Sequence, residues 1–274
     1  MTTFPAVPRF DDFFSDLNRF ILELVRTYET KNLNSWEELE ERVKSYFTAE
    51  IMKQMEALVP GWQKMASYSN GITLVHVMCV FLGLFMLPEF QQLSAEQRQL
   101  AKWIVLLHDI DKFHIRGKKD TMHAFRSGVQ AGNLLPRFGF PTRQHFEERI
   151  VEWSQYTFWA FIPDGPNAAP RPDNRKLPAI LIGIDNLFGQ YTPAALITKT
   201  VLLHISLDVD PSYPTPAPLT TDEIKRCISP VLLPLLRVMM LSDNEGWSLF
   251  DPDTRARQRK DTLKAFEEVE KLIS

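Results

Sequence analysis

The segment that decides the fold is residues 100–112, LAKWIVLLHDIDK. Its apolar residues recur at three- and four-residue spacing, as in a helix that buries one face: Leu100, Trp103, Ile104, Leu107 and Ile110. His108 and Asp109 lie near the end of this stripe. Because imidazole nitrogens and carboxylate oxygens both bind divalent first-row metals, this pair is a candidate metal site.

Lys112 follows His108 by four residues and Asp109 by three, so the three side chains share one side of the helix. A cation in that position suits an anionic ligand bound at a metal. The pair alone is equally consistent with a hydrogen-bonded core histidine beside a capping aspartate. The metal hypothesis therefore depends on further ligands elsewhere in the chain.

The composition bounds the class of protein. The chain has 274 residues, 45% of them hydrophobic, and a net charge of −3, which allows one large domain. This mildly acidic balance argues against wholesale binding to nucleic acid or anionic membranes. Cys79 and Cys227 provide neither a disulfide framework nor a Cys-x-x-Cys metal site, which suits a reducing cytoplasm. With no signal-peptide pattern at residues 1–5, we expect a cytoplasmic protein.

The fold class predicted is all-α, with residues 1–274 forming a single all-helical domain. Only 11 glycines occur, and no long run alternates apolar and polar residues. The predicted helices span residues 10–28, 35–58, 72–87, 94–109, 121–136, 141–161, 177–191, 194–207, 221–241 and 254–273. The run at 72–87 is shorter than a membrane span and contains His76, so we expect a buried helix and no membrane association.

Two residues on apolar helix faces are further candidate ligands. A histidine such as His76 is more often a core residue, but its buried nitrogens need partners, and a metal is one. Asp185 has Leu181 and Ile182 one turn before it and Phe188 one turn after it. A carboxylate on such a face is costly unless it is paired or bound to a metal, so Asp185 is the stronger candidate.

His123 is expected in the first turn of a helix capped by Asp120, on a polar face with Arg126 and Ser127. A surface role and a functional role are both consistent with that position. The preceding basic loop is either a lip over a site or a plain surface loop, and it contains Arg116, Lys118 and Lys119. Three further residues could be ligands but are interpreted as a helix end running into a loop: His204, Asp208 and Asp210.

The order of His76, then His108 and Asp109, then Asp185 on successive helices resembles the HD superfamily of metal-dependent phosphohydrolases. Residues 107–112, LHDIDK, look like the LHDIGK segment of that family. The single HD segment is moderately specific, and the four-residue constellation is more so.

Two other segments contribute to the resemblance. Residues 123–128 look like the helix that contains a third histidine in many members, and residues 184–186 look like the helix of the final aspartate. The resemblance implies an HD-type helical bundle core at about residues 69–191. Helices at residues 8–60 and 194–274 would pack around this core, and they would suit a homodimer or a partner interface.

The chain also departs from the family pattern. Members that cleave cyclic di-GMP have a His-His pair and a Gly-Tyr-Pro motif after the third histidine, whereas residues 151–155 here read VEWSQ. This difference argues against a cyclic dinucleotide substrate and against a fully built second metal site. We therefore expect one tightly held ion, with His123 contacting substrate phosphate or metal-bound water.

The resemblance implies a metal-dependent phosphohydrolase acting on a small phosphate ester or nucleotide. The metal ligands it implies are His76, His108, Asp109 and Asp185. Such a mixed set accepts Mn, Fe, Co, Ni, Mg or Zn. The ion would activate water, with Asp109, Lys112 and His123 as catalytic residues. The substrate phosphate would be bound by Arg116, Lys118 and Lys119.

Two alternatives to a phosphohydrolase stay open. One is an HD-type iron oxygenase with two irons, which needs additional histidines, of which only His123 is well placed. The other is a non-catalytic metal-binding helical module that acts as a sensor or binds a partner. The expected partner is a small phosphorylated molecule, and no nucleic acid is expected.

Overall fold

The computed structural model describes residues 7–113, 120–163, 170–210 and 214–274. Within these residues the protein is all-α, as predicted, apart from one short antiparallel pair of strands. The helices are α1 (Phe10–Phe13), α2 (Ser15–Glu29), α3 (Trp36–Tyr46), α4 (Ala49–Leu58), α5 (Trp62–Ser67), α6 (Ile72–Met86), α7 (Pro88–Gln92), α8 (Ala95–Leu107), α9 (His123–Leu134), α10 (Phe146–Phe158), α11 (Leu177–Phe188), α12 (Pro193–Leu203), α13 (Thr221–Cys227), α14 (Leu233–Trp247) and α15 (Pro252–Ile273). Short 3-10 turns η1 (Tyr68–Gly71), η2 (Leu135–Phe138) and η3 (Asn174–Lys176) and strands β1 (Phe161–Ile162) and β2 (Arg171–Pro172) connect them.

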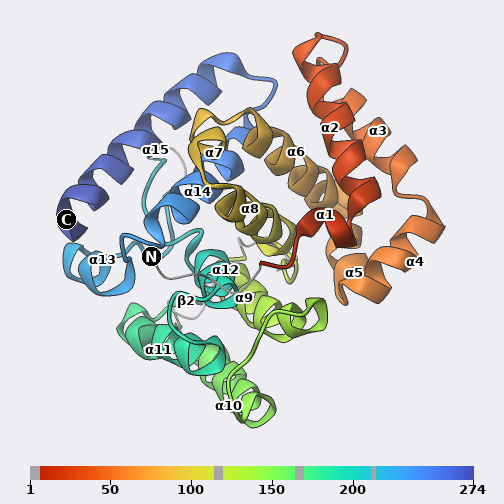
Figure 1. The fold of residues 1–274 in the computed structure, drawn as a ribbon. Coiled ribbons are helices and arrows are strands. Elements are labelled where there is room, and N and C mark those ends of the chain that lie inside the picture. Colours follow the sequence, from red (N-terminus) through yellow and green to blue (C-terminus); the bar gives the residue numbers. More distant parts are fainter. Residues whose placement is uncertain (1–6, 114–119, 164–169, 211–213) are drawn as a thin grey trace.

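Helix α6 is the centre of the fold. Every residue from Thr73 to Leu84 is buried, as expected for a helix that is apolar on all sides. Helices α2, α3, α5, α8 and α14 pack against it. In Figure 1 the N-terminal helices lie on one side of this core, α15 lies on the other, and the pair α10 and α11 forms the far end.

Two glycines let α6 and α14 approach each other closely. A Cβ atom at Gly83 would lie 3.1 Å from the carbonyl oxygen of Ser242, and one at Gly246 would lie 3.1 Å from the backbone nitrogen of Val80. Both positions are therefore filled by neighbouring backbone, which only glycine permits without a shift. This close contact places Asp243, the residue after Ser242, opposite α6.

The N-terminal helices are shorter than predicted. The helix expected at residues 10–28 is interrupted at Phe14, which has non-helical backbone angles and packs into the core. The helix expected at 35–58 is interrupted where Thr48 caps a new helix, its side chain accepting a hydrogen bond from the Ile51 N–H. A capping box formed by Ser94 and Gln97 begins α8.

Three helix boundaries near the predicted ligands also differ. Helix α8 ends at Leu107 with His108 as its C-cap, so Asp109 lies in the following turn. The N-cap of α9 is Met122 and not Asp120, whose carboxylate accepts hydrogen bonds from the N–H groups of Phe113 and Met122. Helix α14 continues six residues beyond the predicted end at residue 241, which brings Asp243 into the helix.

Among the described residues, one helical stretch, Trp62–Met86, is long and apolar enough to cross a membrane by length and composition. Two-thirds of its most apolar window, 67%, is buried inside the protein. This agrees with the prediction that residues 72–87 form a buried core helix. Both cysteines, Cys79 and Cys227, are buried and free.

Candidate metal centre

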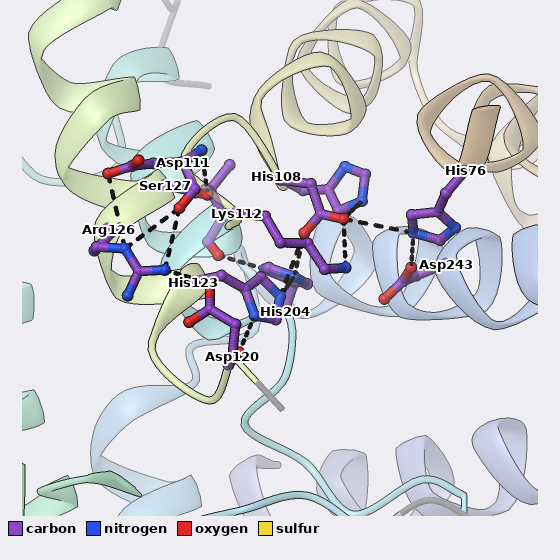
Figure 2. A network of polar contacts seen from close by, with 12 residues as sticks. His76, His108, Asp111, Lys112, Asp120, His123, Arg126, Ser127, His204 and Asp243 are labelled. Atoms are coloured by element: carbon purple, nitrogen blue, oxygen red, sulfur yellow. Dashed lines mark hydrogen bonds and ion pairs between the residues drawn. The ribbon is translucent and has the colours of Figure 1, made fainter. Parts of the chain in front are cut away.

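Side chains from five separate helical regions converge at one buried point (Figure 2). The six residues come from α6, the C-cap of α8 and the turn after it, the start of α9, the C-cap of α12, and α14: His76, His108, Asp109, His123, His204 and Asp243. Except for Asp243, each of these residues is at most 5% exposed. The protein thus brings four imidazoles and two carboxylates together in its interior. Burying such groups is unfavourable in free energy unless each has a partner.

The six side chains form two groups whose ligand atoms lie within 4.8 Å of one another. The first group, named group one here, is His76, His108 and Asp243, with the His76 Nε2 atom 2.9 Å from the Asp243 Oδ1 atom. The second, group two, is Asp109, His123 and His204, with 3.2 Å between the Nε2 atoms of the two histidines. Each group could hold a metal ion through two imidazoles and one carboxylate.

Asp109 lies between the two groups. Its Oδ2 atom is 3.5 Å from the His108 Nε2 atom and 3.7 Å from the His76 Nε2 atom. Its Oδ1 atom is 3.3 Å from the His123 Nε2 atom and 4.0 Å from the His204 Nε2 atom. One oxygen therefore faces the histidines of each group, so Asp109 could contribute to either.

Three of the histidines are fixed in one orientation by the backbone. In each, the Nδ1 atom lies within 2.8 Å of the carbonyl oxygen three residues earlier: His108 on Val105, His123 on Asp120, and His204 on Val201. A carbonyl oxygen only accepts, so each Nδ1 is the protonated nitrogen. In the neutral ring the Nε2 atom is then an acceptor aimed into the cluster, as in histidines that bind metals.

In this orientation the ligand atoms of group two are all hydrogen-bond acceptors that face one another. The Nε2 lone pairs of His123 and His204 face each other across 3.2 Å, and the Asp109 Oδ1 atom lies 3.3 Å from the first of them. The Asp109 Oδ1 atom and the His108 Nε2 atom have no hydrogen-bond partner among the described residues. Buried acceptors that face one another need a cation or a proton between them, so the residues present fit a metal ion.

The surroundings keep these histidines available as ligands. Burial lowers the pKa of His108 and of His204, and it lowers the pKa of His123 well below its usual value. Neutral imidazoles are the form that binds metals. Burial alone would raise the pKa of Asp109, but Lys112 and the neighbouring histidines outweigh it and hold that pKa well below the usual range. Asp109 therefore remains a carboxylate at neutral pH.

Lys112 lies at the edge of the cluster, beyond the turn that follows α8, and not on the helix where the sequence placed it. Its Nζ atom is 2.7 Å from the Asp109 Oδ2 atom, and its side chain is 20% exposed. It also lies over the ring of Trp247, at 5.8 Å. A cation beside the cluster can balance the charge of an anionic ligand.

The predicted polar face of His123 does not point to solvent, so the possibility of a surface histidine is not supported. Arg126 pairs with Asp120 and donates to the Asp111 carbonyl oxygen, and the Asp111 N–H donates to the Ser127 hydroxyl at 3.2 Å. These polar residues bind one another and attach the turn after Asp109 to α9 (Figure 2). His123 is left 5% exposed inside the cluster.

Asp185 belongs to neither group, in contrast to the prediction that it completes the ligand set. Its carboxylate pairs with Lys199 of α12 at 2.7 Å, and its side chain is 22% exposed. The cost of a carboxylate on an apolar face is met by this lysine, so no metal is needed to explain it. Asp243 occupies the position expected for Asp185.

His204, Asp208 and Asp210, which the sequence placed at a helix end running into a loop, have different roles in the structure. His204 is in group two, whereas the Asp208 carboxylate accepts a hydrogen bond from the Thr215 N–H and the Asp210 carboxylate accepts one from Gln258. The expectation of a single ion rested on a shortage of ligands for a second one, and His204 supplies a further candidate ligand. The basic-loop residues Arg116, Lys118 and Lys119 lie outside the described residues.

The sequence contained a signal for Asp243 that was missed. Asp243 follows Met239 and Met240 by one turn and precedes Trp247 by one turn, so it is a carboxylate on an apolar helix, as Asp185 is. Because the predicted helix ended at residue 241, Asp243 was expected outside it and was not recognised as a carboxylate on an apolar helix. For His204 the signal was its burial within an apolar run, residues 201–205, VLLHI.

No family model, curated protein or solved structure matches this chain.

Proposed function

We propose that the protein is a metal-dependent enzyme that binds two divalent ions and hydrolyses a small phosphate ester or nucleotide. The observation that carries the proposal is the position of Asp109, whose Oδ1 atom faces the two histidines of group two while its Oδ2 atom faces the two histidines of group one. Paired ions held in this way are a recurring arrangement in phosphatases and nucleases. When bound, the ions would supply a nucleophilic water and polarise a phosphoryl oxygen.

The residues of this chain would have distinct roles in that reaction. The Nε2 atoms of the four histidines and the Asp243 carboxylate would hold the ions. Asp109, as a carboxylate between the two groups, could also accept a proton from the attacking water. Lys112, within 2.7 Å of Asp109, would balance the negative charge of the substrate phosphate.

The same residues extend the resemblance to the HD superfamily. With Asp243 in place of Asp185, the chain order becomes His76, then His108 and Asp109, then His123, His204 and Asp243. The predominance of imidazole favours Mn, Fe, Co, Ni or Zn over Mg, which prefers oxygen ligands. Membership of the superfamily remains part of this proposal.

A second candidate function is oxidation of a small molecule by O₂ at two iron ions. The observation that favours it is His204, which supplies the additional histidine that such a site needs. With it, each group contains two histidines and a carboxylate, a set typical of non-haem iron oxygenases. A non-catalytic metal-binding module is the remaining alternative.

The test uses metal-free protein reloaded separately with Mn²⁺, Co²⁺, Zn²⁺ or anaerobic Fe²⁺. Phosphate release from a panel of phosphomonoesters and nucleotides is measured beside O₂ uptake by the Fe²⁺ form. We expect metal-dependent phosphate release that Asp109→Asn abolishes and Asp185→Asn retains. O₂ uptake with a candidate substrate, without phosphate release, would establish the second function, and bound metal with neither activity would indicate a binding module.

A further inference from the structure

His76 is held differently from the other three histidines of the cluster. Its Nδ1 atom is buried and has no hydrogen-bond partner among the described residues, whereas His108, His123 and His204 each donate from Nδ1 to a carbonyl oxygen. Its Nε2 atom faces Asp243, which is itself a candidate ligand. No polar group outside the ligand set therefore fixes the orientation of this ring.

His76 contacts an aromatic side chain in addition to Asp243. The indole ring of Trp247 stacks on the His76 imidazole, with 4.1 Å between ring centroids and 18° between ring planes. Stacked rings restrict each other's tilt, and such contacts are favourable beyond the area that they bury. Trp247 follows Asp243 by four residues, so one turn of α14 presents both side chains to His76.

The stack continues towards the protein surface. The ring of Trp36, the first residue of α3, is nearly parallel to that of Trp247, at 5° and 6.0 Å. Trp247 nevertheless remains 51% exposed, so it contributes little as a core residue. The tight contact of Gly246 with the Val80 backbone fixes α14 at the point where Trp247 leaves the helix.

We infer that Trp247 is a positioning residue that holds His76 in the orientation required for metal binding. This inference rests on the metal site proposed above. Trp247 orients the His76 ring by stacking, whereas backbone carbonyl oxygens orient the other three histidines by hydrogen bonds. Loss of the indole should therefore weaken the ion at group one and leave group two unchanged, because His123 and His204 keep their carbonyl partners.

The experiment measures binding of Co²⁺ and of Zn²⁺ to metal-free protein by calorimetry, with the visible spectrum of Co²⁺ as a report on ligand geometry. The variants are Trp247→Ala, Trp247→Phe and Trp159→Ala. Trp159 is the matched control, since it is 69% exposed and belongs to neither group. Circular dichroism melts establish that each variant is folded.

We expect wild type to bind two ions and Trp247→Ala to bind one of them about 10-fold more weakly or worse, the loss typical of damage to groups that orient metal ligands. Trp247→Phe should restore most of that affinity, and Trp159→Ala should match wild type. In a double-mutant cycle, Trp247→Ala should have no further effect once His76→Ala is present.

Different outcomes would overturn different statements. Two unchanged binding steps in Trp247→Ala would overturn this inference and leave the proposed metal site intact. Equal weakening of both steps would also overturn it, because the ring would then act on the whole fold. A wild-type protein that binds neither Co²⁺ nor Zn²⁺ would overturn the metal site and the inference together.

Discussion

Asp185 and Asp243 are both carboxylates on apolar helices, and the structure gives them different partners. Asp185 on α11 pairs with Lys199 of α12, one carboxylate with one ammonium group. Asp243 on α14 lies 2.9 Å from the His76 Nε2 atom, and the nearby imidazole lowers the pKa of Asp243 even though burial alone would raise it. A carboxylate on an apolar helix face thus indicates that a partner is present. The identity of that partner depends on the helix packed against it.

The difference extends to the charge balance of the two sites. The pair at Asp185 is neutral, whereas the described side chains of the cluster combine two carboxylates and four imidazoles with one ammonium group, that of Lys112. With its histidines neutral, the cluster has a deficit of positive charge. A bound cation would correct this deficit, and nothing comparable is needed at Asp185.

The largest expected effect is that of Asp109→Ala. Because Asp109 faces both groups, its removal should weaken both ions, each by about 100-fold or more, at the upper end of losses seen at metal sites. Isothermal titration of metal-free protein with Zn²⁺ measures this. Retention of either ion at wild-type affinity would mean that Asp109 does not bridge the groups.

The comparison itself is tested by Asp243→Asn beside Asp185→Asn. The first should weaken one ion by about 10-fold or more, and the second should leave both affinities unchanged. The two substitutions are chemically identical, so a general effect of the amide cancels. The reverse result would restore Asp185 as the ligand.

The same Asp185→Asn variant should lose stability. Lys199 is 13% exposed, and removing its charged partner costs about 1–3 kcal/mol in the free energy of unfolding, as for other hydrogen bonds to charged groups. Denaturant unfolding of metal-free protein measures the loss. The double variant Asp185→Asn with Lys199→Met should recover part of it, and no recovery would indicate that the pair is not the cause.

The smallest expected effect is on pH dependence. The pKa values of His108, His123 and His204 are lowered in the folded protein, so below about pH 6.5 the unfolded chain binds more protons than the folded one. Stability of the metal-free protein should therefore fall as pH decreases below that value. Unfolding at pH 7.5 and 5.5 measures this, and His204→Gln should reduce the slope. Stability that rises on acidification would contradict the burial of neutral histidines.

Local patterns were enough to predict much of this protein. The apolar stripe from Leu100 to Ile110 predicted a buried helix with His108 and Asp109 near its end, and both lie in the cluster. The long apolar run around His76 predicted the central helix α6. The all-α class followed from the small number of glycines and the absence of a long run of alternating apolar and polar residues.

Contacts between distant elements were beyond the reach of the sequence alone. Lys199, which neutralises Asp185, lies on the next helix, and nothing at residue 185 distinguishes a lysine partner from a metal. The placement of Asp243 depends on the close approach of Gly83 and Gly246 to the opposite backbone. His123 is buried beside an ion pair of Arg126 with Asp120, whereas the sequence placed Arg126 on a polar face consistent with a surface histidine.

The most direct test of the account is the metal content of the purified protein, measured by elemental analysis and repeated after metal-free protein is reloaded with Co²⁺ or Zn²⁺. The account predicts two ions per chain in wild type, two in Asp185→Asn, and fewer in Asp243→Asn and Asp109→Ala. A wild-type chain that stays metal-free on titration would contradict it, and so would an Asp243→Asn variant that binds both ions as tightly as wild type.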